Sequence, residues 1–198
     1  MDANGEPQDR SRTRSNSRDA SISPGAVEEA LRVGAPARPQ PVRWACRLLT
    51  SVEVNKNAPV VAADRIEIAA SSQSVWDVLT DIKNWPSWNP DVKSMSMQGG
   101  LTEGSVFRWK AGPGTITSRI QHVEPPRVIG WTGAILGIKA KHVYRLEPRD
   151  GATLVQTEES YEGLVVRLLR GSLQKTLDKG LSDGLRYLKA ETERRAPS

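Results

Sequence analysis

Two tryptophans and two prolines lie within the seven residues from Asn84 to Pro90 (NWPSWNP), after a run with helical spacing and before a strand-like run. Proline disfavours a continued helix at its own position and at the residue before it. The segment therefore predicts a helix that ends, turns and directs the rings of Trp85 and Trp88 inward. Either the rings fill the core, or they close one end of a ligand cavity.

The chain has 198 residues, enough for one ordinary domain and a tail. Residues 1–58 contain an Arg/Ser run, Arg10–Arg18, and a Pro-rich run, Ala35–Pro41, with almost no apolar periodicity. Such a segment buries too little apolar surface to offset its chain entropy. We therefore expect residues 1–58 to be a disordered Arg/Ser/Pro-rich extension, although Val42–Val54 is apolar enough for a short helix or an extra strand.

The net charge of +5 is spread along the chain. Residues 1–58 hold nine basic and seven acidic residues, and the remainder holds 19 and 16. A specific nucleic-acid partner is therefore not expected, while nonspecific contact of the arginines in residues 10–18 with acidic partners, or peripheral contact with a membrane, stays open.

Targeting features are sparse. No run of about 18 apolar residues is present, so a transmembrane segment is excluded, and no apolar region typical of a secretory signal follows the early arginines. Cys46 is the single cysteine and lies outside the expected domain, which suits a reducing compartment. We expect a cytoplasmic protein, and the oligomeric state stays open.

The order of elements from Val61 onward is regular. Asp64–Ala70 alternates polar and apolar residues, as in a strand, and Ser74–Ile82 has helical spacing after capping serines. Turn residues then separate six strand-like runs, which predicts an antiparallel meander. These runs are Asp91–Gln98, Ser105–Ala111, Thr115–Val123, Arg127–Gly133, Ile138–Glu147 and Ala152–Glu162.

A long helix is expected from about Leu164 to Glu193, with an apolar stripe that covers the sheet. The stripe consists of Leu169, Leu173, Leu177, Leu181, Leu185 and Leu188. Gly180 and Gly184 lie near it, and each weakens the helix by about 1 kcal/mol relative to alanine. Their missing side chains leave room for backbone contact or for a ligand.

Four segments together resemble the SRPBCC superfamily, which includes START domains and birch-pollen-allergen-like proteins, and are most similar to its bacterial polyketide cyclase/dehydrase and lipid-transport family. The resemblance covers Val61–Arg195 and rests on IEIAASSQSVWDVLTDIKNWPSWNPDV, EPPRVIGW, HVYRLEPRDGATLVQTEES and a terminal helix that begins at Gly163. It implies the α+β helix-grip fold: a curved antiparallel sheet of six to seven strands wrapped around a long C-terminal helix, with two short helices after the first strand.

The same resemblance implies an apolar ligand pocket between the sheet and the last helix. Two tryptophans are expected at its mouth, and large or polar strand residues and small or apolar helix residues along its walls. The expected ligand-binding residues are Trp85, Trp88, Trp109, Trp131, His142, Tyr144, Tyr161, Leu177, Gly180, Leu181 and Gly184.

His142 and Glu159 are the candidate acid/base pair, with Tyr144 as a third catalytic candidate. The Pro148–Gly151 turn places His142 opposite Thr157 to Glu159 on the neighbouring strand. A histidine bonded to a carboxylate could move a proton to or from a carbonyl compound. The alternative is an exposed cross-strand pair that contributes only tenths of a kcal/mol.

No cofactor or metal is expected. His122 and His142 stand apart with no cysteine nearby, no Gly-x-Ser-x-Gly motif occurs, and Gly112–Thr115 lacks the lysine of a phosphate-binding loop. The leading hypothesis is a carrier for a small hydrophobic molecule such as a lipid, polyketide, isoprenoid or aromatic metabolite. The alternatives are a cyclase- or dehydratase-like enzyme that uses His142, and a regulatory or interaction module whose cavity has no function.

Overall fold

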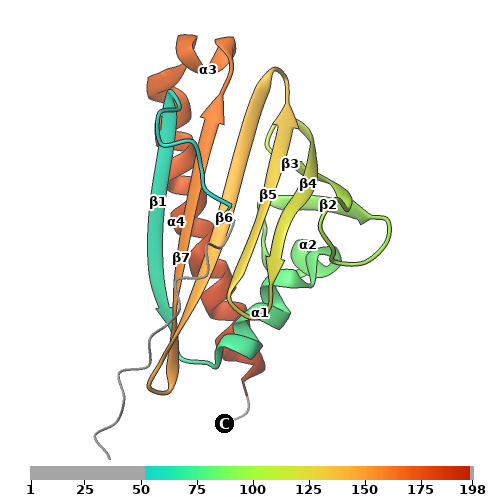
Figure 1. Cartoon of the computed structure of the whole chain (residues 1–198), viewed down its shortest axis with the longest axis vertical. Helices are drawn as coiled ribbons and strands as arrows, with labels where there is room; N and C mark the ends of the chain where they lie inside the picture. Colours follow the sequence, from blue (N-terminus) through green and yellow to red (C-terminus); the bar gives the residue numbers. More distant parts are fainter. Residues whose placement is uncertain (1–51, 197–198) are drawn as a thin grey trace, which may run out of the picture. The chain divides into compact units, whose positions relative to one another are not determined.

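The structure, a computed structural model, describes residues 52–196. These residues form a seven-stranded antiparallel sheet in the order β1-β7-β6-β5-β4-β3-β2, and the longest helix, α4, runs along one face (Figure 1). The strands are β1 (Val60–Ile68), β2 (Val92–Met97), β3 (Val106–Ala111), β4 (Gly114–Glu124), β5 (Val128–Ile135), β6 (Ile138–Arg149) and β7 (Ala152–Glu162). This curved sheet with its long helix confirms the predicted helix-grip fold.

Three short helical segments connect β1 to β2: α1 (Ser72–Thr80), a 3-10 turn η1 (Ile82–Asn84) and α2 (Trp85–Trp88). The α1 helix begins two residues earlier than expected because Ser71, rather than a later serine, is its N-cap. The Ser71 hydroxyl accepts a hydrogen bond from the backbone N–H of Ser74 at 3.1 Å. The predicted stop before Pro86 is confirmed, since the helical path breaks at Asp81 and restarts at Trp85.

Alternation along the strands sorts their side chains onto two faces. In β7, Thr153, Val155 and Thr157 are buried, whereas the residues between them are half-buried, as predicted. The inner face, which is turned towards α4, carries a continuous core cluster that includes Phe107, Ile120, Ile129, Trp131, Tyr144, Leu146 and Val155. Leu185 and Leu188 of α4 belong to the same cluster, so the helix covers this face.

The C-terminal helix is interrupted, contrary to expectation. It divides at Leu169 into α3 (Leu164–Leu168) and α4 (Arg170–Arg195). Leu169 is 53% exposed and does not belong to the buried stripe, whereas Leu177, Leu181, Leu185 and Leu188 do. Within α3 only Val166 is buried, so little packing holds this first turn in line with the rest.

Residues 52–58 belong to the folded domain, although the sequence placed them in a disordered extension. Val54 is buried, the N–H of Asn55 donates to Ser160 Oγ at 3.2 Å, and Arg145 Nη2 donates to the Val52 carbonyl at 3.1 Å. This segment packs on the outer face of the sheet, where a side chain on Gly130 would approach Val52 to 2.7 Å. The rest of the predicted extension, residues 1–51, lies outside the described residues.

Candidate functional site

Four polar side chains from β6 and β7 meet on the inner face of the sheet. His142 and Glu159 are directly paired in the strand register, as predicted from the turn. His142 Nδ1 lies 3.4 Å from Glu159 Oε2, and His142 Nε2 lies 2.7 Å from Thr157 Oγ1. The Tyr144 ring stacks on the imidazole, with centroids 4.7 Å apart. The structure therefore brings the three catalytic candidates together and adds Thr157 to them.

Burial, rather than a charged partner, controls the ionisation of this cluster. Desolvation raises the pKa of Glu159 and lowers the pKa of His142, so both side chains favour their neutral forms near neutral pH. Burial likewise raises the pKa of the Tyr144 hydroxyl. The side chains of His142 and Glu159 are only 11% and 14% exposed. The alternative of an exposed surface pair is therefore wrong.

A group of aromatic rings continues from this cluster towards α2. Trp131 stacks on Tyr144 at 5.7 Å, and its ring also lies 5.7 Å from that of Trp85. Trp85 meets Phe107 and Trp109 edge to face at 6.0 Å each. Its indole N–H donates to the Leu79 carbonyl at 2.9 Å. Trp85 therefore lies at the centre of the aromatic group, not at the mouth of a pocket as expected.

The other predicted ligand-binding residues divide between two regions. Leu177 and Leu181 pack in a second core cluster with Val60, Ala62 and Val166, and Tyr161 lies against that cluster. Trp88 is partly buried, and its buried indole N–H has no hydrogen-bond partner among residues 52–196. Trp88 therefore packs against the cluster that contains Trp85 and Trp131, whereas Leu177, Leu181 and Tyr161 belong to the second cluster.

The two glycines of α4 differ in their surroundings. A side chain on Gly184 would lie 3.9 Å from the Tyr144 hydroxyl, which places Gly184 beside the polar cluster. A side chain on Gly180 would meet no atom of the described residues within 4 Å, and Gly180 is exposed. Neither glycine therefore allows the helix backbone to approach the sheet closely. The other explanation, that the glycines leave room for a ligand, stays a prediction.

Sequence reasoning missed Phe107, Ser118 and Thr157. Phe107 stands two residues before Trp109 on β3, so alternation could have placed it on the inner face. Ser118 accepts a hydrogen bond from the Trp109 indole at 3.1 Å, and it lies opposite Phe107 in the register. Thr157 was considered as a cross-strand neighbour of His142, but its hydroxyl contact depends on side-chain rotation that no pattern encodes.

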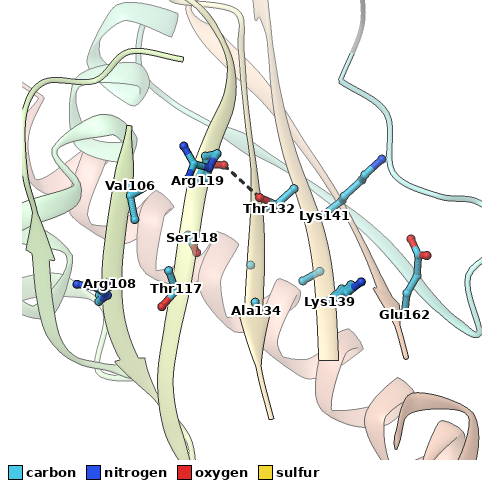
Figure 2. A pocket seen from close by; sticks show the side chains of 12 residues that line it. Val106, Arg108, Thr117, Ser118, Arg119, Thr132, Ala134, Lys139, Lys141 and Glu162 are labelled. Carbon is cyan, nitrogen blue, oxygen red and sulfur yellow. Dashed lines mark hydrogen bonds between the residues drawn. The ribbon is translucent and has the colours of Figure 1, made fainter. Parts of the chain in front are cut away.

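A pocket of about 750 Å³ lies on the outer face of the sheet, away from the residues predicted to bind a ligand. Its floor consists of small residues of β4 and β5, and long cationic side chains stand on both sides. In Figure 2, the side chains of Arg119, Thr132 and Lys141 stand in front of the strands, with α4 behind them. Lining residues include Arg108, Thr117, Ser118, Arg119, Thr132, Gly133, Ala134, Lys139, Lys141 and Glu162.

Residues 52–196 contain no group of three or more His, Cys, Asp or Glu side chains that could hold a metal ion. Over the same residues, no helix is both long and apolar enough to cross a membrane.

Comparison with known proteins agrees with this architecture. The family described as polyketide cyclase/dehydrase and lipid transport matches residues 59–193. No curated protein matches the chain. A hypothetical protein from Helicobacter pylori is similar in structure, with a TM-score of 0.62 and 16% identity over 80% of this chain and 99% of that one.

Two further solved structures show the same fold. A START superfamily protein from Mycobacterium smegmatis has a TM-score of 0.55 and 18% identity, covering 69% of this chain and 99% of its own. The Zhui aromatase/cyclase from a Streptomyces species has a TM-score of 0.58 and 18% identity, covering 70% of this chain and 96% of its own. Likeness at such low identity shows the fold alone.

Proposed function

Because this chain belongs to the polyketide cyclase/dehydrase and lipid transport family, we propose that it binds a small hydrophobic molecule between α4 and the inner face of the sheet. The ligand carries a carbonyl or hydroxyl group that reaches the His142–Glu159 pair. Its apolar part lies along the aromatic group formed by Trp85, Trp109 and Trp131.

The buried polar cluster is the observation that carries this proposal. Burying a polar side chain costs free energy unless it is hydrogen-bonded, so cores made only for packing rarely collect several of them. Here His142, Glu159, Thr157 and Tyr144 gather on one face beside stacked rings. Ligand sites have this composition, with apolar and aromatic walls and a few polar groups that orient the ligand.

The glycines of α4 support an approach to this cluster from the helix side. Gly184 keeps α4 free of a side chain opposite the Tyr144 hydroxyl, and Gly180 faces open space one helical turn earlier. A leucine at position 184 would project towards the Tyr144 hydroxyl and the proposed ligand. Gly171 is also a glycine of α4 with open space around it, but it lies more than two turns from Gly180.

The first experiment is native mass spectrometry of protein from its own organism, followed by extraction and identification of any bound small molecule. We expect a stoichiometric hydrophobic adduct. Ligand titrations by tryptophan fluorescence would then compare Gly184→Leu with Gly171→Leu, and only the former should lose affinity. The proposal is wrong if the purified protein is free of ligand and no lipid or polyketide in a panel changes its fluorescence.

The neutral state of the pair favours one second candidate, a cyclase- or dehydratase-like reaction. A neutral His142 imidazole can accept a proton from the carbon next to a carbonyl, and a protonated Glu159 can donate one to a departing hydroxyl, which leaves as water. His142→Ala should abolish turnover and leave ligand affinity within a few fold. Equal losses of turnover and affinity would instead assign His142 to binding.

A further inference from the structure

Every exposed large hydrophobic side chain among residues 52–196 lies at one end of the folded unit. Four of them are on α3 and the residue after it, and one is in the turn between β5 and β6. They are Leu136 (72% exposed), Leu164 (78%), Val165 (37%), Leu168 (83%) and Leu169 (53%). We refer to these five residues as the apolar tip.

The two parts of the apolar tip are neighbours in the fold, because the β5–β6 turn lies against the start of α3. A side chain on Gly137 would lie 3.7 Å from Val165 Cγ2, and one on Gly163 would lie 2.3 Å from the Gly137 carbonyl oxygen. Figure 1 shows α3 and the β5–β6 turn at the end opposite α1. The five exposed side chains therefore lie on adjacent segments rather than as scattered exposures, and an exposed apolar surface of that kind marks an interaction site.

Leu136 adopts a backbone conformation with positive φ, which asparagine, aspartate and glycine adopt more easily than leucine. Ile135 and Ile138 are paired, and the two residues between them have φ of +46° at Leu136 and +80° at Gly137. A two-residue turn with both φ values positive favours asparagine, aspartate or glycine. A branched apolar residue there is strained and exposed, so neither the turn nor the core accounts for it.

Cations surround the apolar tip. Arg167 lies within α3, Arg170 begins α4, and Lys139 is the second residue of β6. All three are exposed, and none forms a salt bridge with another of the described residues, while the acidic side chain nearest in the register is Glu162 opposite Lys139. Lys139 also lines the outer-face pocket, whose further cations extend this positive region.

We propose that the apolar tip inserts into the surface of an anionic lipid bilayer, with Arg167, Arg170 and Lys139 contacting the lipid headgroups. The tip is aliphatic and protrudes, so it can enter a bilayer without a partner of matching shape. Protein interfaces, in contrast, are enriched in aromatic residues. Aliphatic side chains beside lysines and arginines are the composition of surfaces that bind anionic membranes. The inference stands independently of the inner site.

The test uses the full chain and sedimentation with vesicles of phosphatidylcholine alone or mixed with phosphatidylglycerol. We expect binding to the mixed vesicles and little to phosphatidylcholine. Arg167→Gln should weaken binding about fivefold. The same substitution at Lys83, an exposed residue of η1 in the connection between β1 and β2, should change it much less.

A second pair of variants separates insertion from misfolding. Leu136→Asn relieves the strained turn, so thermal stability should stay equal or rise while vesicle binding falls about tenfold. Leu168→Asn, at an exposed helical position, should have a similar effect on binding.

Three outcomes overturn the proposal. The first is equal affinity for both kinds of vesicle, or for neither. The second is unchanged binding by the Leu136→Asn, Leu168→Asn double variant. The third is light scattering that shows a dimer which this double variant dissociates, because the tip would then bind a second copy of the chain. Ligand binding by the inner site is measured separately, so its failure is distinguishable from these results.

Discussion

The imidazole of His142 faces the carboxyl group of Glu159 across the β6–β7 pair, with Nδ1 3.4 Å from Oε2. Both side chains lie on the face that α4 covers, and desolvation favours the neutral form of each. An acid and a base are thus kept side by side without forming an ion pair. The physical consequences of this arrangement can be measured.

Folding stability should be highest between about pH 4.5 and 6.5. Burial raises the pKa of Glu159 from 4.5 to about 8, so the folded protein holds a proton that the unfolded chain releases, and stability falls as the pH rises towards 8. Burial lowers the pKa of His142 from 6.5 to about 3, so stability also falls as the pH drops below 4.5. Between the two ordinary pKa values, the opposite slopes cancel.

Glu159→Gln should remove the alkaline loss, which amounts to at most about 1.4 kcal/mol per pH unit for one proton. Urea unfolding followed by circular dichroism over a pH series measures it. Glu162→Gln is the matched control, because Glu162 is on the same strand but on the outer face. An alkaline decline that persists in Glu159→Gln would show that Glu159 does not carry a proton in the folded state.

Trp85→Phe should destabilise the protein by about 2 kcal/mol. The change removes the hydrogen bond from the indole N–H to the Leu79 carbonyl and leaves space among three aromatic rings. Trp88→Phe is the control, because the buried Trp88 indole N–H has no partner within the described part of the chain, so its removal should cost little or stabilise. Equal losses in urea unfolding would contradict the central position of Trp85.

Gly163→Ala should cost more than about 2 kcal/mol. Gly163 has φ of +135°, and its added methyl group would lie 2.3 Å from the backbone oxygen of Gly137. Gly171→Ala should instead stabilise by up to about 1 kcal/mol, because Gly171 is helical and has open space around it. Thermal unfolding of the two variants compares the effects, and a neutral Gly163→Ala would be inconsistent with the close approach.

Thr157→Val should lower stability by about 1–3 kcal/mol, since it leaves His142 Nε2 buried without its partner at 2.7 Å. Thr117→Val places the same change on the exposed outer face of β4 and should stay within about 0.5 kcal/mol. If both variants unfold at the same urea concentration as the parent chain, the threonine hydroxyl does not support the imidazole.

Local sequence patterns determined where the helices and strands lie and how β6 pairs with β7. Strand boundaries were predicted within a few residues because turn residues such as Pro148–Gly151 and period-two alternation act over short distances. The pairing of His142 with Glu159 followed from the length of that turn. A helical break before Pro86 was also predicted, but it falls at Asp81, and Pro86 itself lies in the first turn of α2, where a helix tolerates proline.

Only the tertiary structure decided which of these residues are buried, and beside what. The burial of His142 and Glu159 depends on α4, far along the chain, and on Trp131 from a different strand. The packing of Val54 on the outer face and the exposure of Leu169 and Leu136 depend in the same way on contacts across the fold. A sequence pattern reports the periodicity of one segment, whereas the burial of a side chain depends on contacts from several segments. The neutral state of His142 and Glu159 therefore depends on the tertiary structure.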